Sequence, residues 1–77
     1  MKSGEKIRKL RESLKLTRSE FAKRLNYTTT YIYQLEKGLR NAGLSVLQKI
    51  AETFNVSIMD LVGEKEKFVV TEDDESI

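Results

Sequence analysis

The side chains best suited to specific chemistry lie close together, at residues 28–34, and they are hydroxyls and an amide. Such groups donate and accept hydrogen bonds without carrying charge. The chain has no His and no Cys, so it lacks the commonest general base, a thiol nucleophile and the usual zinc ligands. It has no glycine-rich phosphate loop, and its densest carboxylate run, residues 72–75, lies in an acidic end segment. We therefore expect a binding protein and not an enzyme, with no cofactor and no metal.

Charge is distributed unevenly along the chain. Residues 1–63 hold 12 Lys and Arg against 6 Asp and Glu, a net charge of +6, whereas residues 64–77 hold 2 against 6, a net of −4. We expect residues 1–63 to form one folded domain and residues 64–77 to form an acidic, flexible tail. The basic part favours a polyanionic partner, most often nucleic acid, although a merely solvated basic surface gives the same count.

Two absences bear on location. The chain has no cysteine for disulfides, and no apolar run approaches the roughly 20 residues of a membrane span. No signal peptide is recognisable at its polar beginning. These features predict a cytoplasmic protein that makes no membrane contact, and no small-molecule ligand is evident.

Apolar residues recur at helical spacing in several stretches, which predicts an all-α fold. The expected helices cover about residues 4–14, 18–25, 29–37 and 44–54, with a short fifth helix at about 57–62. The expected core residues are Ile7, Leu10, Leu14, Leu16, Phe21, Ala22, Leu25, Ile32, Leu35, Leu44, Leu47, Ile50, Ala51, Phe54 and Val56.

Polar residues mark where these helices begin and end. Thr17 and Glu20 have the spacing of a capping box, in which each side chain accepts a backbone N–H of the other. Thr28 is a second candidate N-cap, and Gly43 a weak one before the fourth helix. Gly38 stands where a left-handed residue would end the third helix.

The join between the second and third helices is the most informative feature. It leaves the roughly 3–4-residue turn of a helix-turn-helix, whose third helix projects from the body and suits the major groove of DNA. Ile32 and Leu35 would face inward. Gln34 could pair with adenine, because an amide both donates and accepts. The residues expected to read bases are Thr29, Thr30, Tyr33 and Gln34.

The chain resembles the lambda repressor and Cro-type helix-turn-helix domains, also called the xenobiotic response element family, over about residues 4–62. The runs that carry the resemblance are residues 7–11, 16–22, 31–38, 47–51 and 56–61. It implies a compact five-helix domain that binds a pseudo-palindromic double-stranded DNA operator as a homodimer and regulates transcription, by default as a repressor. It also implies a structural ion pair between Arg11 and Glu36.

Polar side chains around the third helix are expected to contact DNA phosphates. They are Arg18, Thr28, Tyr31, Lys37, Arg40 and Asn41. The family usually has Gln at position 18 and Pro at position 42, where this chain has Arg and Ala, so charge is added at one site and the loop at the other is looser. The residues at 31–32 and 40–41 also resemble restriction-modification controller proteins, which activate as well as repress.

Several alternatives remain open at this stage. The tyrosines Tyr27, Tyr31 and Tyr33 could instead stack on single-stranded nucleic acid. The same fold could serve as a protein-interaction or antitoxin-like module. For dimerisation we expect a surface made by Ile58, Met59 and Val62, with residues 68–70 as a further candidate, and for the acidic end either a solubilising role or competition with DNA.

Overall fold

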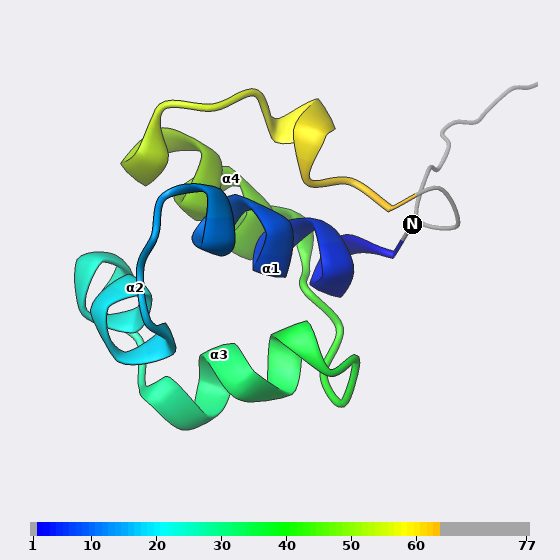
Figure 1. Cartoon of the computed structure of the whole chain (residues 1–77). Coiled ribbons are helices and arrows are strands. Elements are labelled where there is room, and N and C mark those ends of the chain that lie inside the picture. Colours follow the sequence, from blue (N-terminus) through cyan, green and yellow to red (C-terminus); the bar gives the residue numbers. More distant parts are fainter. Residues whose placement is uncertain (1, 64–77) are drawn as a thin grey trace, which may run out of the picture.

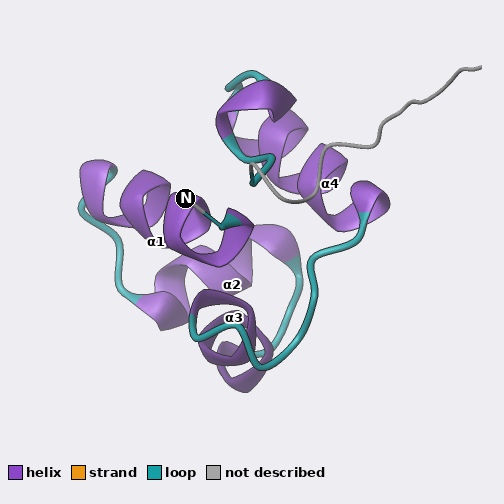
Figure 2. Ribbon diagram, turned by 90° about the vertical axis from the view of Figure 1, so that its right-hand side faces the viewer, coloured by secondary structure: helices purple, strands orange, loops and turns teal. Residues whose placement is uncertain are grey.

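The computed structural model describes residues 2–63 of the 77-residue chain. Four α-helices follow one another as α1 (Ser3–Ser13), α2 (Arg18–Leu25), α3 (Thr29–Glu36) and α4 (Leu44–Phe54), and a 3-10 turn occupies Ile58–Asp60 (Figure 1). Figure 2 shows helices and loops but no strand in this part of the chain. The all-α prediction is confirmed, and the four helices lie within one residue of their expected bounds.

At the place of the predicted short fifth helix the structure has only that 3-10 turn, so a count of five helices is not confirmed. The Ser57 hydroxyl accepts the Met59 N–H at 3.2 Å, and the Asp60 and Leu61 N–H groups donate to carbonyls three residues back. Leu61 is then only 1% exposed. The turn therefore ends with Leu61 buried as its C-cap.

Helix α3 lies along one edge of the molecule (Figure 1). It packs against both α1 and α2, while α2 also packs against α4, and α4 packs against the 3-10 turn. One long side of α3 is therefore left uncovered by the other helices. In the described part of the chain, no helix is long and apolar enough to cross a membrane.

The core lies between the helices, and the buried Phe21 stacks on the half-buried Phe54 with ring centroids 4.7 Å apart. Its buried members are Ile7, Phe21, Ala22, Leu25, Ile32, Leu35, Leu47, Ile50, Ala51, Leu61 and Val62. Of the expected core residues, Leu10, Leu16, Phe54 and Val56 are half-buried.

Two expected core residues are exposed instead. Leu14 is 40% exposed, because it is the C-cap of α1 and the chain turns away there through Lys15 at φ 59°. Leu44 is 57% exposed at the first position of α4, beyond the body of the core. The helical spacing was right in both cases, but each residue lies at a helix end that no other element covers.

The capping predictions are confirmed. The Thr17 N–H donates to Glu20 Oε1 at 2.8 Å, and the Thr17 hydroxyl accepts the Glu20 N–H at 3.1 Å. The Thr28 hydroxyl accepts the Tyr31 N–H at 3.1 Å. Gly38 has φ 76°, the left-handed conformation expected after α3. These local bonds fix where α2 and α3 begin, and so how the two helices face each other.

Gly4 allows α1 to approach α3 closely. A Cβ at this position would collide with the backbone carbonyl oxygen of Leu35 and would lie 3.2 Å from that of Glu36. The approach is therefore backbone against backbone, at the end of α3. Nothing in the sequence pattern had singled out this glycine.

Candidate nucleic-acid interface

The connection between α2 and α3 is a tight turn. Asn26 ends α2 in the left-handed conformation, at φ 62°, and the Tyr27 N–H donates to the Ala22 carbonyl at 2.9 Å. Thr28 then caps α3. A turn this short places the two helices as a helix-turn-helix.

The outward side of α3 carries the predicted polar row. Thr29 and Thr30 are exposed, Tyr33 is 42% exposed and Gln34 is half-buried. The inward side is formed by Ile32 and Leu35, at 0% and 1% exposure. The four residues expected to read bases therefore lie together on the accessible side of the helix, and each can offer a hydrogen-bonding group.

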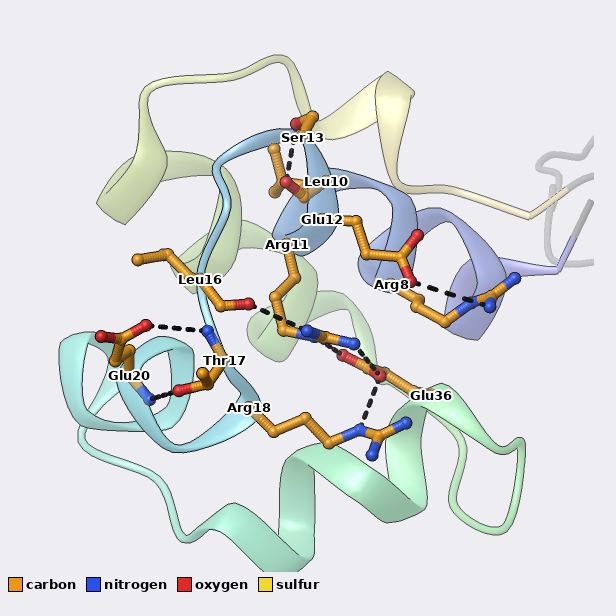
Figure 3. Close-up of polar contacts among 10 residues, drawn as sticks. All are labelled: Arg8, Leu10, Arg11, Glu12, Ser13, Leu16, Thr17, Arg18, Glu20 and Glu36. Atoms are coloured by element: carbon orange, nitrogen blue, oxygen red, sulfur yellow. Dashed lines mark hydrogen bonds and ion pairs between the residues drawn. The ribbon is translucent and has the colours of Figure 1, made fainter.

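The ion pair implied by the family resemblance is present and largely buried. Arg11 Nε donates to Glu36 Oε2 at 2.7 Å and Arg11 Nη2 donates to Oε1 at 3.2 Å (Figure 3). The Glu36 side chain is 1% exposed and that of Arg11 12%. Arg11 Nη1 also donates to the Leu16 carbonyl at 2.9 Å. The hydrogen bond to Glu36 raises the pKa of Arg11 above its ordinary value, so the guanidinium stays charged and ties α1 to the end of α3.

Arg18 joins the same carboxylate, which the sequence had not indicated. Its Nε donates to Glu36 Oε1 at 2.9 Å, and Figure 3 shows the side chain reaching from the start of α2 to Glu36. Its Cζ lies 5.2 Å from the centroid of the Tyr33 ring. The side chain is 34% exposed, and a guanidinium has five donor hydrogens, so Arg18 retains donors for an acceptor outside the protein. The one available signal was the arginine at a position where the family usually has Gln.

The remaining predicted phosphate contacts surround α3. Lys37, Arg40 and Asn41 are exposed in the segment after the helix, and Thr28 is exposed at its start. The ammonium of Lys37 lies 5.8 Å from the Tyr33 ring centroid. The interface therefore has uncharged groups along its middle and cations at its edges, the arrangement that separates base contacts from phosphate contacts.

The tyrosines do not form one flat platform. Tyr31 is half-buried and meets the Tyr27 ring edge to face, with centroids 5.0 Å apart. Burial raises the pKa of Tyr27, and the Lys49 ammonium lies 4.5 Å from its ring centroid. Rings crossed in this way cannot present parallel faces to successive bases, which argues against the single-strand alternative. Lys49, on α4, is a cation beside Tyr27 that the sequence analysis had not named.

The comparison with known proteins fits this geometry. Residues 7–61 match the helix-turn-helix family. The chain belongs to that family. The lambda repressor-like resemblance is thereby confirmed over most of the part that carried it. No solved structure matches this helix-turn-helix chain to a significant degree.

The relatives of the helix-turn-helix chain include a repressor, a control protein and an antitoxin. The chain is 29% identical over 65 residues to the immunity repressor of Bacillus phage phi105, covering 84% of the chain and 45% of the repressor. It is 34% identical over 65 residues to the control protein C.MunI of Mycoplasma sp., covering 83% and 88%. It is 32% identical over 70 residues to the antitoxin PezA of Streptococcus pneumoniae serotype 4 (strain ATCC BAA-334 / TIGR4), covering 91% and 44%. The chain thus spans less than half of the phage repressor and the antitoxin, and most of the control protein.

The residues expected to form a dimer surface differ in how exposed they are. Met59 is 63% exposed and Ile58 is half-buried, but Val62 is 8% exposed and belongs to the core of the helix-turn-helix domain. Val62 is therefore removed from the predicted surface, since its side chain is already covered within one chain. Residues 68–70 and 72–75 lie outside the described residues. Within residues 2–63, no group of three or more His, Cys, Asp or Glu is placed to hold a metal ion.

Proposed function

We propose that this chain binds specific sites on double-stranded DNA and regulates transcription, with α3 in the major groove. The observation that carries the proposal is the two-sided α3: its inner side is buried and pinned through Glu36, and its outer side exposes a row of hydroxyl and amide groups. A major groove admits one helix and displays donors and acceptors on the base edges. Membership in the helix-turn-helix family supports the same conclusion.

Phosphate contacts would fix the position of α3. Thr28 lies at its start, whereas Lys37 and Asn41 follow its end. Arg18 would use the donors that it does not spend on Glu36. Each neutralised phosphate releases counterions, so affinity should fall steeply as salt is raised.

We further propose that the protein acts as a homodimer and controls promoter access by occupancy. Two copies would place their recognition helices on half-sites roughly 34–36 Å apart, or a multiple of that spacing. The exposed Met59 and the half-buried Ile58 supply a candidate self-contact. The phage relative is named a repressor, which favours repression, whereas the Mycoplasma relative is named a control protein.

The competing function is a protein-interaction module, which the resemblance to an antitoxin favours. It makes a different prediction for affinity. An interaction module needs neither a preferred duplex nor a steep salt dependence, whereas a sequence-reading protein needs both.

The test is a selection of bound duplexes from a random pool, followed by titration of the selected and a scrambled duplex over a salt series. We expect the selected duplex to bind about 10³-fold more tightly or better. The slope of log affinity against log salt concentration should correspond to several neutralised phosphates. Thr29→Ala should weaken binding to the selected duplex, while Thr53→Ala, at an exposed threonine on α4, should not. Equal affinity for both duplexes would instead support the interaction module.

A further inference from the structure

Gln34 on α3 and Arg40 in the following loop are bonded to each other. Arg40 Nε donates to Gln34 Oε1 at 3.1 Å, and the Arg40 backbone N–H donates to the Gln34 carbonyl at 3.3 Å. The Arg40 Cζ lies 5.6 Å from the Tyr31 ring centroid, within cation–π range. The guanidinium is therefore held against α3 while Arg40 remains exposed to solvent.

The backbone explains why two residues six positions apart can meet. Gly38 takes a positive φ that ends α3 and turns the chain back. The Leu39 N–H then donates to the same Gln34 carbonyl, at 2.9 Å. The loop is thus wound onto Gln34 by two backbone bonds, and these bonds do not depend on the side chain of residue 40.

We infer that Gln34 and Arg40 read one base pair together, and that this pair selects guanine. This inference rests on the proposed function and adds a specificity determinant to it. Because one lone pair of Gln34 Oε1 accepts the Arg40 bond, the amide has less acceptor capacity left, whereas its Nε2 still carries two donor hydrogens. The guanidinium adds further donors and has no acceptor at all.

The chemistry of the major groove determines which base such a unit fits. Guanine presents two adjacent acceptors, N7 and O6, whereas adenine presents one acceptor and one donor. A glutamine with a free amide matches adenine, because it both donates and accepts. A Gln34–Arg40 unit that offers donors matches guanine. Guanine thus replaces adenine, the base expected from Gln34 alone. Arg40 becomes a base contact instead of a phosphate contact.

The test is duplex selection repeated with variants, each checked by circular dichroism for native folding. Gln34→Ala identifies the base pair in question, as the one whose preference it removes. We expect the wild-type protein to prefer guanine there, and Arg40→Ala, which frees the amide, to shift the preference to adenine. On the wild-type operator, each single variant should lose affinity on the order of 10- to 100-fold.

Lys37→Ala is the matched control, since it removes one exposed cation from the same end of α3 and leaves both partners of the Gln34–Arg40 bond in place. It should weaken binding to all duplexes alike and leave the selected sequence unchanged. The double variant Gln34→Ala/Arg40→Ala should lose about as much affinity as either single variant, because both remove the same contact.

Two results would overturn the inference while leaving the proposed function intact. One is an Arg40→Ala protein that selects the wild-type sequence and merely binds every duplex more weakly. The other is a wild-type preference for adenine at the base pair that Gln34 controls. A wild-type protein that selects no sequence at all would overturn the proposed function itself, and this inference with it.

Discussion

Helix α3 carries two acceptors that are bound by arginines, and they lie in opposite environments. Glu36 is 1% exposed and is held by Arg11 and Arg18 at 2.7 and 2.9 Å. Gln34, two residues earlier, is half-buried and accepts from the exposed Arg40 at 3.1 Å. A buried carboxylate must keep its partners, because water cannot replace them, whereas an exposed pair can exchange its bonds with solvent or with a ligand.

This contrast distinguishes arginines that hold the helices together from arginines that remain accessible to a ligand. Arg11 is fixed by a carboxylate and a carbonyl, so it holds the helices together. Arg40 is held on the accessible side, so it can face a ligand. Arg18 belongs to both classes, since one nitrogen binds the buried carboxylate while a third of its side chain remains exposed. If the contrast holds, variants of the buried contacts should lose more stability than variants of the exposed ones.

Glu36→Gln should have the largest effect. It removes the charge that compensates Arg11 and Arg18, and breaking a buried pair costs about 3 kcal/mol or more of unfolding free energy. Urea unfolding measures this loss. The matched control is Glu12→Gln, whose pair with Arg8 spans 3.9 Å between side chains about half exposed, and which should cost less than about 0.5 kcal/mol. Equal losses in the two variants would show that the Glu36 contacts are not the anchor of α3.

Gly4→Ala should follow, because it pushes α1 away from the same end of α3. The added Cβ would meet the Leu35 carbonyl oxygen, which belongs to the backbone and cannot swing aside. Overpacking of this kind costs roughly 1–3 kcal/mol. Gly43→Ala is a useful comparison, since a Cβ there would contact nothing within 4 Å. A thermal melting point that drops no further for Gly4→Ala than for Gly43→Ala would contradict the close approach.

Arg18→Gln should divide its effect between stability and binding. One bond to the buried Glu36 is lost while Arg11 keeps its two, so we expect a stability cost of about 1 kcal/mol, smaller than for Glu36→Gln. Binding should lose about one phosphate contact, seen as a reduced slope of log affinity against log salt. The base preference should not change, in contrast to Arg40→Ala. An unchanged slope together with a large stability loss would place Arg18 wholly in the structural class.

Much of the fold could be predicted because its signals are local. Thr17 and Thr28 cap the helices that follow them, and Gly38 takes the left-handed conformation that ends α3. The outward row of α3 follows from the position of Ile32 and Leu35 on the opposite side. Each of these features depends on residues within about one helical turn, so the spacing of residue types was enough.

The features that were missed depend on residues far apart in the chain. Gly4 matters only because α3 crosses α1 at that point, and Val62 is buried in a segment that returns to α1, where Lys6 Nζ donates to its carbonyl at 2.8 Å. Arg18 meets Glu36 across 18 positions, and the bond that joins Arg40 to Gln34 requires the loop to fold back. From the sequence we predicted candidate DNA contacts, but their hydrogen bonds to one another could not be predicted.

Glu20 should give the smallest effect, and it extends the comparison to a fully exposed carboxylate. The Thr17 backbone N–H is the main cause that lowers the pKa of Glu20 below its ordinary value, helped by the nearby positive charges of Arg24 and Lys23. A lowered pKa in the folded state means that the ionised form stabilises the fold. This contribution is complete above the pKa of the unfolded chain and is lost as pH falls through the lower, folded-state pKa. Wild-type protein should therefore exceed Glu20→Gln in stability near neutral pH, and the difference should vanish in acid.

Unfolding curves of wild-type protein and Glu20→Gln from neutral to acid pH measure this difference in stability. Repeating them in about 1 M salt screens Lys23 and Arg24, so the part that survives belongs to the hydrogen bonds that Glu20 forms with Thr17. A difference that does not change with pH would show that the Glu20 charge contributes nothing to the cap.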